Sequence, residues 1–276
     1  MSVSERPLVI KIGGSVDDPT ALLDDIAAHR GPIVVVHGAH RVLDELATRL
    51  GHPPRFVTSV RGATSRYTDT ESMDHFLMAY CGLVNKRLVQ QLLARGVRAV
   101  GLSAMDGGMV RGRRRAALRV RDGERMVVLH GDHAGSIETV DSGLLESLLS
   151  QGGVPVICPP ALGDDGVPIN VDGDRLTAEL AIALRASRMV IFSDTNGFLA
   201  DPHDATSTVS TASLDDLPAL GEAAQGRARV KLAAVGRALQ GGVEEVGLCC
   251  ALAERPLRRA LDGDGSWFRA TAAAAV

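Results

Sequence analysis

The chain of 276 residues has a formal net charge of −3, and only 3% of its residues are aromatic. A weakly acidic chain with so few aromatic rings lacks the positive field and the stacking surfaces of nonspecific nucleic-acid binding, so we expect no nucleic-acid partner. No apolar run reaches the ~20 residues of a membrane span and the N-terminus carries no signal-peptide pattern, so we expect a cytoplasmic protein with no membrane partner.

The first predicted element is a buried strand over residues 8–12 that runs directly into Gly13 and Gly14. A short apolar strand that ends in two glycines is typical of a tight turn whose bare backbone can approach an anionic ligand. Lys11 lies inside this strand, where burial is costly unless its ammonium group meets a negative charge. Lys11 therefore either faces a phosphate site or lies on an edge strand with its ammonium group in water.

Apolar runs alternate with helical periodicity along most of the chain. Further strands are expected at residues 33–36, 97–102, 154–158, 189–192 and 243–250. Helices are expected at residues 20–29, 40–50, 70–81, 83–95, 141–150, 176–185 and 230–240, with a break at Gly82. This alternation predicts an α/β fold with a mainly parallel sheet, in which ligands bind at the carboxyl ends of the strands.

Two stretches depart from this alternation. Residues 56–66 are expected to form a loop or an irregular ribbon. Residues 117–121 and 126–129 flank Asp122-Gly123, which predicts a β-hairpin that projects from the body of the protein. The densest charge run, at residues 111–115, comes just before this hairpin and is either a solvated edge or a docking site for an acidic partner.

Polar residues gather after two later apolar runs. Asn170, Asp172 and Asp174 come just before an expected helix, where they either cap that helix or belong to a site. Residues 193–197 end another strand, and their polar side chains suit contacts to a ribose or an adenine, or merely form a turn. Lys231 is expected in the first turn of the helix over residues 230–240.

Lysine and cysteine are both scarce in this chain. Of the 30 lysine and arginine residues only three are lysine: Lys11, Lys86 and Lys231. Lysine is therefore either kept where a compact ammonium group is needed or has survived a codon bias by chance. The four cysteines have no metal-ligand spacing, which predicts reduced thiols in the core and no protein-bound metal.

Two strand-end glycine turns, two distant lysines and an acidic pair before a helix together predict phosphoryl transfer to a carboxylate. A carboxylate is already a nucleophile and needs no strong base. It must, however, be brought against a γ-phosphate while the charge on the equatorial oxygens is stabilised. Two ammonium groups and oriented backbone N–H groups would stabilise that charge, and an aspartate between the lysines would hold both in place.

Four motifs carry a family resemblance: Lys11-Ile12-Gly13-Gly14, His37-Gly38-Ala39, residues 169–174 and Val230-Lys231-Leu232. Together they resemble successive motifs of the amino-acid kinase family, in its acetylglutamate kinase branch. The stretches that more closely resemble kinases acting on carrier-bound 2-aminoadipate or glutamate are residues 51–56, 80–89 and 112–114. In those kinases the amino group of the substrate is attached to the C-terminus of a small acidic amino-group carrier protein of the LysW type.

The resemblance covers nearly the whole chain and implies a three-layer αβα sandwich, with a mainly parallel central sheet and a projecting β-hairpin. It implies one domain over residues 1–276, in which residues 1–165 bind the acceptor and the carrier and residues 166–276 bind ATP. Mg²⁺ would arrive with ATP and need no ligand from the protein, and a homodimer is expected.

The same resemblance implies roles for individual residues. Lys11 and Lys231 would stabilise the transition state, and Asp174 would organise them. The acceptor would be held by Gly38, Ala39, Arg66 and Asn170. The nucleotide would contact Gly13, Gly14, Ser193, Asp194, Asn196 and Gly197. The acidic carrier would be attracted by four arginines of the hairpin, Arg111, Arg113, Arg114 and Arg115.

One motif departs from the family pattern. The family usually has His-Gly-Gly, whereas here Ala39 and His40 follow Gly38, a change that would narrow the acceptor site or alter its specificity. Two alternative functions remain open: a kinase acting on free N-acetylglutamate, and a catalytically inactive sensor of an amino acid or a nucleotide. Also open is whether the acceptor is glutamate or 2-aminoadipate, which differ by one methylene group.

Overall fold

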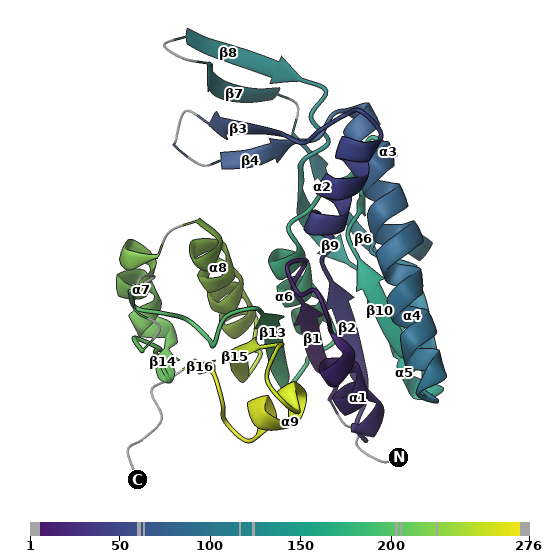
Figure 1. The fold of residues 1–276 in the computed structure, drawn as a ribbon, viewed down its shortest axis with the longest axis vertical. Coiled ribbons are helices and arrows are strands. Elements are labelled where there is room, and N and C mark those ends of the chain that lie inside the picture. Colours follow the sequence, from purple (N-terminus) through teal and green to yellow (C-terminus); the bar gives the residue numbers. More distant parts are fainter. Residues whose placement is uncertain are drawn as a thin grey trace.

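An eight-stranded sheet forms the centre of the computed structural model, which describes residues 6–59, 62, 64–115, 117–122, 125–201, 204, 206–224 and 226–270 (Figure 1). In spatial order its strands are β14 (Thr211–Ser213), β16 (Ser266–Arg269), β15 (Glu245–Cys250), β13 (Arg188–Ser193), β1 (Leu8–Ile12), β2 (Ile33–His37), β10 (Val154–Cys158) and β5 (Ala99–Ser103). Neighbouring strands run parallel except β15 and β16. The turns that follow β1, β2 and β13 therefore meet along one edge of the sheet.

Helices cover both faces of this sheet and make three layers (Figure 1). The helices on one face are α1 (Thr20–Ala28), α4 (Asn85–Ala94) and α9 (Pro256–Leu261). Those on the other are α5 (Gly143–Ser150), α6 (Gly173–Ala183) and α8 (Gly226–Gln240), with α7 (Leu217–Ala223) against α8. The predicted αβα sandwich with a mainly parallel sheet is confirmed.

The side chains of β1 alternate between these two layers, as successive residues of a strand must. Ile10 and Ile12 pack in the layer of α1, α4 and α9, and Val9 packs in the layer of α6 and α8. Lys11 lies two residues after Val9, so its side chain points to the α6 and α8 face. β1 pairs with β13 on one side and β2 on the other. This position excludes the alternative in which Lys11 lies on an edge strand.

Two smaller four-stranded sheets complete the fold. One has the order β12 (Pro168–Ile169), β11 (Ala161–Gly163), β6 (Val110–Arg114) and β9 (Gly135–Val140). The other, at the top of Figure 1, has the order β4 (Thr64–Tyr67), β3 (Arg55–Ser59), β7 (Ala117–Asp122) and β8 (Arg125–His130). The predicted hairpin is confirmed as β7 and β8, and Gly123 at its turn lies outside the described residues.

The pair β3 and β4 replaces the loop or irregular ribbon expected at residues 56–66. Val57 of β3 packs in a small apolar cluster with Leu118 and Val120 of β7. This cluster is formed by residues far apart in the chain, and it stabilises a ribbon that has no continuous apolar run of its own.

The helical stretch from Thr70 to Ala94 is continuous, so the predicted break at Gly82 is wrong. α3 (Thr70–Leu77) passes through a π-helix at Met78–Val84 into α4. A glycine costs a helix only about 1 kcal/mol, and the burial of Tyr80 in the same turn offsets that cost. Beyond the π-helix, buried Asn85 donates a hydrogen bond to the Val156 carbonyl at 2.9 Å and ties the stretch to β10.

Both helices that carry predicted site residues begin earlier than expected. α6 begins at Gly173, and the carboxylate of Asp172 caps it by accepting a hydrogen bond from the Arg175 N–H at 2.8 Å. α8 begins at Gly226, which places Lys231 in the second helical turn rather than the first. Asp174, expected just before a helix, therefore lies inside the first turn of α6.

Two sequence expectations concern the chain as a whole. Within the described ranges no helix combines the length and the apolar character needed to cross a membrane. All four cysteines are free thiols, as predicted, but only Cys158 and Cys249 are buried in the core, whereas Cys81 and Cys250 are partly exposed.

Candidate active site

Lys11 of β1 and Asp174 of α6 form a buried ion pair at the centre of the molecule. The Lys11 Nζ and Asp174 Oδ1 atoms are 2.6 Å apart, and the two side chains are only 11% and 10% exposed. Gly173 leaves room for this approach, because a Cβ atom at that position would make a tight 3.2 Å contact with the Lys11 Cε atom. Of the two acids noted before the helix, Asp172 is therefore a helix cap and Asp174 is the partner of Lys11.

Lys231 of α8 faces the same pair. Burial lowers the pKa of Lys231. The carboxylate of Asp174 raises that pKa and the ammonium group of Lys11 lowers it, so both charges act on the Lys231 ammonium group. α8 is fixed on α6 by Arg237, which donates to both carboxylate oxygens of Glu179 at 2.9 and 3.0 Å. Such a bidentate pair restricts the orientation of both helices. The structure thus brings together two lysines and one aspartate from three separate parts of the chain.

Two glycine turns meet beside this group. The Gly13 N–H donates to the Phe192 carbonyl at 2.8 Å, and the Gly38 N–H donates to the Ile12 carbonyl at 2.9 Å. A Cβ atom on Gly14 would lie 2.9 Å from the Ala39 nitrogen, closer than real Cβ atoms approach. The two turns can therefore pack only as glycines, and they present bare backbone at the carboxyl edge of the sheet, where an anion is favourably bound.

Arg66 and Asn170, predicted to hold the acceptor, are both anchored by neighbouring side chains. Arg66 of β4 forms an ion pair with Asp44, and its guanidinium carbon lies 5.1 Å from the centre of the Phe56 ring. Asn170 donates from its side-chain amide to the Thr68 hydroxyl at 3.1 Å. Because the amide nitrogen is used in this way, the Asn170 side-chain oxygen is turned away from Thr68.

The residues predicted to contact the nucleotide follow β13. Ser193 ends the strand, and its hydroxyl lies 3.1 Å from that of Thr195. The charge of Asp194 acts on Lys231, which places this turn beside α8. Asn196 lies in the same turn, and Gly197 adopts a φ of 95°, a left-handed conformation that favours glycine.

Four arginines were predicted to bind the carrier from the hairpin, and this placement is wrong. Arg111, Arg113 and Arg114 lie on β6, Arg115 directly follows it, and β6 pairs with β9 in the other small sheet. Two of the four already have acidic partners: Arg113 lies 3.2 Å from Glu138 and Arg114 lies 2.8 Å from Asp165. The described arginines of the hairpin itself are Arg119, Arg121 and Arg125.

Sequence reasoning missed the pair of His40 and Arg227. In the sequence His40 stands out only as a departure from a family motif, and Arg227 precedes the helix expected at residues 230–240. The Arg227 Nη1 atom lies 3.4 Å from the His40 Nδ1 atom, and burial lowers the pKa of His40 to about 4. The signal that could have found Arg227 is its position four residues before Lys231, on the same helical face.

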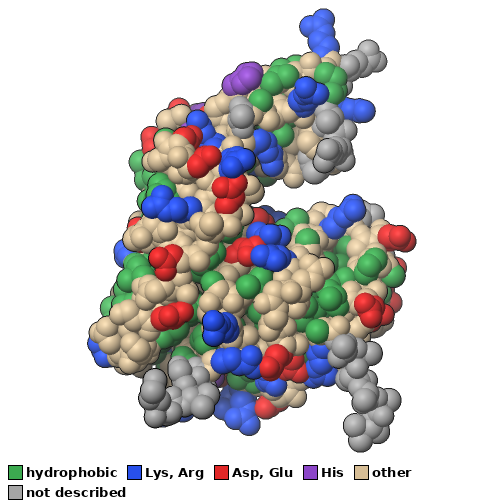
Figure 2. Space-filling view, turned by 180° about the vertical axis from the view of Figure 1, so that it is seen from behind, with side chains coloured by type: hydrophobic (Ala, Val, Ile, Leu, Met, Phe, Trp, Pro, Cys, Tyr) green, Lys and Arg blue, Asp and Glu red, His purple; other side chains and the backbone are tan. Residues whose placement is uncertain are grey.

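Figure 2 shows that the molecule is hollowed between the sheet of β3, β4, β7 and β8 and the helices α7 and α8, with acidic and basic side chains at the inner end. Within the described residues no group of three or more His, Cys, Asp and Glu side chains is placed to hold a metal ion. The cationic and donor groups gathered at the site are ammonium, guanidinium and backbone N–H groups, which bind anions.

The chain is similar to known proteins over most of its length. The LysW-aminoadipate kinase of Deinococcus radiodurans is 41% identical over 263 residues, which cover 94% of this chain and 90% of that protein. The LysW-aminoadipate kinase of Thermus thermophilus is 38% identical over 268 residues, which cover 95% and 100%. Among solved structures, an N-acetylglutamate synthase from Neisseria gonorrhoeae is similar with a TM-score of 0.78 and 25% identity, covering 97% of this chain but only 60% of the synthase.

A model of one protein family matches most of the chain. It is described as the amino acid kinase family, and it matches residues 6–249, which include β1, β2, α6 and α8. The two kinases above also exceed 30% identity over more than nine tenths of this chain. The chain belongs to the amino acid kinase family.

Proposed function

We propose that this protein is an ATP-dependent kinase that phosphorylates the side-chain carboxylate of 2-aminoadipate or glutamate while that amino acid is attached to an acidic amino-group carrier protein of the LysW type. The observation that carries the proposal is the buried contact of Lys11 with Asp174, with Lys231 facing it from α8. The printed names of the Deinococcus and Thermus relatives support the carrier-bound substrate.

The reaction follows from the charges at this site. A carboxylate oxygen of the acceptor attacks the γ-phosphorus of ATP, the bond to the β–γ bridging oxygen breaks, and an acyl phosphate and ADP result. Lys11 and Lys231 stabilise the charge on the transferring phosphoryl group, and Asp174 holds the Lys11 ammonium group in place. No proton has to be removed from the acceptor, so the site needs no general base.

The remaining predicted residues divide between the two substrates. The backbone at Gly38 and Ala39 and the side chain of Arg66 hold the acceptor, and residues 1–165 form the acceptor part, to which Asn170 contributes from just beyond it. Residues 166–276 form the nucleotide part, with contacts from Ser193, Asp194, Asn196 and Gly197 and from the phosphate-facing Gly13 and Gly14 of the first turn. Mg²⁺ would arrive with ATP and is assigned no ligand from the protein.

The carrier docks on the face of the β3–β4–β7–β8 sheet that holds Arg66. Residues opposite each other in an antiparallel pair share a face. The register pairs Phe56 with Arg66, Met126 with Arg121 and Val128 with Arg119, and Phe56, Met126 and Val128 are 57%, 59% and 47% exposed. Thr58 faces Arg121 across β3 and β7, which joins these pairs into one surface. The acidic carrier would also contact four further arginines, Arg111, Arg113, Arg114 and Arg115. Bound on this docking face, it would place its tethered amino acid near Arg66.

Trapping of the acyl phosphate with hydroxylamine tests the proposed function. The purified protein is incubated with ATP, Mg²⁺ and one of three acceptors: the carrier adduct of 2-aminoadipate, the carrier adduct of glutamate, or free N-acetylglutamate. ATP-dependent hydroxamate on a carrier adduct is the expected result. Formation of hydroxamate from N-acetylglutamate alone would favour the acetylglutamate kinase alternative. If no hydroxamate forms with any of the three acceptors, an inactive sensor is favoured. We further propose a homodimer, which analytical ultracentrifugation tests.

A further inference from the structure

His40 and Arg227 join two helices from opposite halves of the site. His40 is the first residue of α2 (His40–Arg49), and Arg227 lies in the first turn of α8. The guanidinium group of arginine can only donate hydrogen bonds, so the His40 Nδ1 atom must accept at their 3.4 Å contact. The imidazole therefore carries its proton on Nε2 and is neutral. Burial and the charges of Arg227 and Lys11 lower the pKa of His40 to about 4, which keeps it neutral at physiological pH.

The contact lies directly above the Gly14 turn. A Cβ atom on Gly14 would lie 2.5 Å from the His40 Nδ1 atom, so that nitrogen rests against the backbone proposed to face the phosphates. Arg227 is one helical turn before Lys231, and side chains four residues apart share a helical face. The charge of Arg227 acts on both Lys231 and His40, so the guanidinium group lies near both.

Arg227 also differs from the other cations around His40 in its partners. Lys11 is paired with Asp174, and Arg66 is paired with Asp44. Within the described part of the chain no ion pair gives Arg227 a carboxylate partner. A cation held beside the phosphate-facing turn by a neutral imidazole keeps its full charge for an incoming anion.

We propose that Arg227 is a catalytic residue that binds the transferring phosphoryl group, and that His40 is a positioning residue that holds the guanidinium group over the Gly14 turn. This inference rests on the proposed function. As the γ-phosphorus leaves the β–γ bridging oxygen and bonds to the acceptor carboxylate, Arg227 donates to two non-bridging phosphoryl oxygens. The planar fork of the guanidinium group matches that geometry. No proton is transferred by either residue.

The variant Arg227→Gln tests the first part, with Arg229→Gln as the matched control from the same turn of α8. We expect Arg227→Gln to lower kcat about 100-fold with little change in the KM for ATP, and Arg229→Gln to match the wild type. Binding of ADP with aluminium fluoride and the carrier adduct, a mimic of the transition state, should weaken to a similar extent, while binding of ADP alone should not. An unchanged kcat, or a change confined to KM, would overturn the assignment.

The pair His40→Asn and His40→Leu tests the second part. The two side chains are similar in shape, but only asparagine offers an oxygen near the position of Nδ1. We expect His40→Leu to lower kcat by on the order of 10-fold to 100-fold through misplacement of Arg227, and His40→Asn to retain most of the wild-type kcat. Combining His40→Leu with Arg227→Gln should add little to Arg227→Gln alone. Equal activity of the two His40 variants would contradict the positioning role.

These outcomes are separable from the proposed function. If the wild-type protein phosphorylates only free N-acetylglutamate, the proposed acceptor is wrong, and the same variants still report on Arg227 with that acceptor. If the wild-type protein transfers phosphate to no acceptor, the proposed function fails and the role of Arg227 fails with it. If the wild type is active on the carrier adduct and Arg227→Gln is equally active, only the role of Arg227 is overturned.

Discussion

The ammonium group of Lys11 and the carboxylate of Asp174 lie 2.6 Å apart although 163 residues separate them in the sequence. One side chain comes from the strand next to the middle of the sheet and the other from the first turn of α6. A buried lysine is tolerated there because the carboxylate compensates its charge, and the carboxylate is tolerated because of the lysine. The pair therefore supports the fold and the proposed reaction together.

Replacement of Lys11 separates these two contributions. We expect Lys11→Ala to lower the rate of acyl phosphate formation at least ~100-fold, because one preorganised charge stabiliser is removed. It should also lower the free energy of unfolding, since Asp174 is left as an unpaired buried charge. In the double variant Lys11→Met with Asp174→Leu, urea unfolding should show recovered stability while activity stays lost. A single variant with nearly wild-type turnover would show that Lys11 is misassigned.

Replacement of Gly14 tests the close approach of the two turns. In Gly14→Ala the added methyl group would meet the Ala39 nitrogen at 2.9 Å and the His40 ring at 2.5 Å, so the turns must separate. We expect a large loss of activity and a lower melting temperature. Gly221→Ala in α7 is the matched control, because no heavy atom lies within 4 Å of the added methyl group. That control should be neutral or stabilise the protein by about 0.5–1 kcal/mol. Wild-type activity in Gly14→Ala would refute the proposed packing.

The stability of the protein should depend on pH through His37. Burial lowers the pKa of His37 to about 4, and its neutral ring accepts a hydrogen bond from the Asn85 amide at 3.2 Å. In the unfolded chain the group titrates near 6.5 and takes up a proton that the native state does not. Stability is therefore full above pH ~6.5 and falls by about 3 kcal/mol as the pH drops towards 4.

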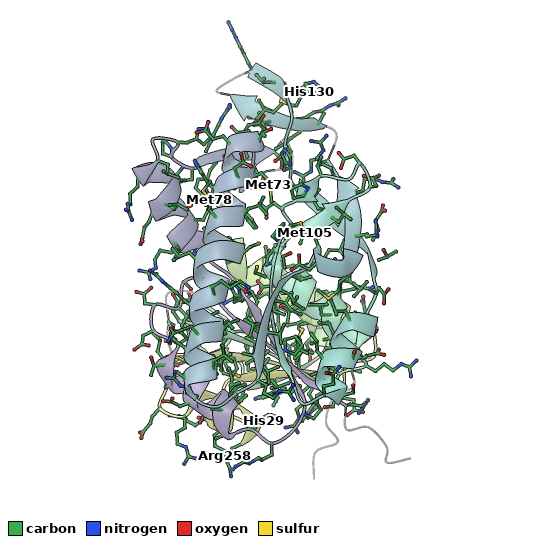
Figure 3. The ribbon with its side chains drawn as sticks, turned by 90° about the vertical axis from the view of Figure 1, so that its right-hand side faces the viewer. His29, Met73, Met78, Met105, His130 and Arg258 are labelled. Carbon is green, nitrogen blue, oxygen red and sulfur yellow. The ribbon has the colours of Figure 1, made fainter. Side chains whose placement is uncertain are left out.

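Urea unfolding between pH 7 and pH 4.5 measures this effect. His37→Gln should lower the stability at pH 7 and flatten its dependence on pH. His130→Gln is the control, because His130 is exposed on β8 at the far end of the molecule (Figure 3). If His37→Gln keeps the wild-type slope, His37 does not control the acid sensitivity.

Carrier binding should depend on the docking face and on salt. We expect replacement of Arg119 and Arg121 by glutamine to weaken binding of the carrier adduct and to reduce its salt dependence, because screened attraction between opposite charges is lost. Arg258 and Arg259 lie on α9 at the opposite end of the molecule, where Figure 3 labels Arg258. Their replacement by glutamine should leave the affinity for the carrier adduct and its salt dependence unchanged. Equal affinities for both double variants, measured by calorimetry, would place the carrier elsewhere.

The four arginines at residues 111–115 should contribute less to that binding. Arg113 and Arg114 already face carboxylates of Glu138 and Asp165, which neutralise part of their charge. We therefore expect a variant with all four replaced by glutamine to lose less affinity than the Arg119 and Arg121 variant. The same calorimetric titration compares the two sets, and a larger loss in the four-arginine variant would reverse this order.

Periodicity and composition predicted the parts of the fold that depend on local sequence. The buried run of β1, the hairpin of β7 and β8 and the unusual setting of Lys11 all follow from a few consecutive residues. The break predicted at Gly82 failed because tertiary packing of the π-helix outweighs a weak local propensity. The ribbon of β3 and β4 was missed because its partners Leu118 and Val120 lie far along the chain.

The residues of the candidate site likewise divide into those that local sequence could predict and those that it could not. Motifs identified Lys11, Asp174 and Lys231, whose separate local patterns each resemble a family motif. The contact between His40 and Arg227 has no local signal, since it joins residues 187 positions apart. The arginines of β6 were misplaced for a similar reason, because neither their sheet nor their acidic partners can be read from residues 111–115 alone.

The most direct test of the account is the single-turnover rate of ATP-dependent acyl phosphate formation on the carrier adduct in Lys231→Ala and Lys86→Ala. Lys86 is the matched control, because its ammonium group donates to the Gly101 carbonyl at 3.2 Å and serves the packing of α4. We expect a loss of ~100-fold or more for Lys231→Ala and a nearly wild-type rate for Lys86→Ala. A wild-type rate in Lys231→Ala would contradict the claim that two lysines steered by Asp174 act on the transferring phosphoryl group.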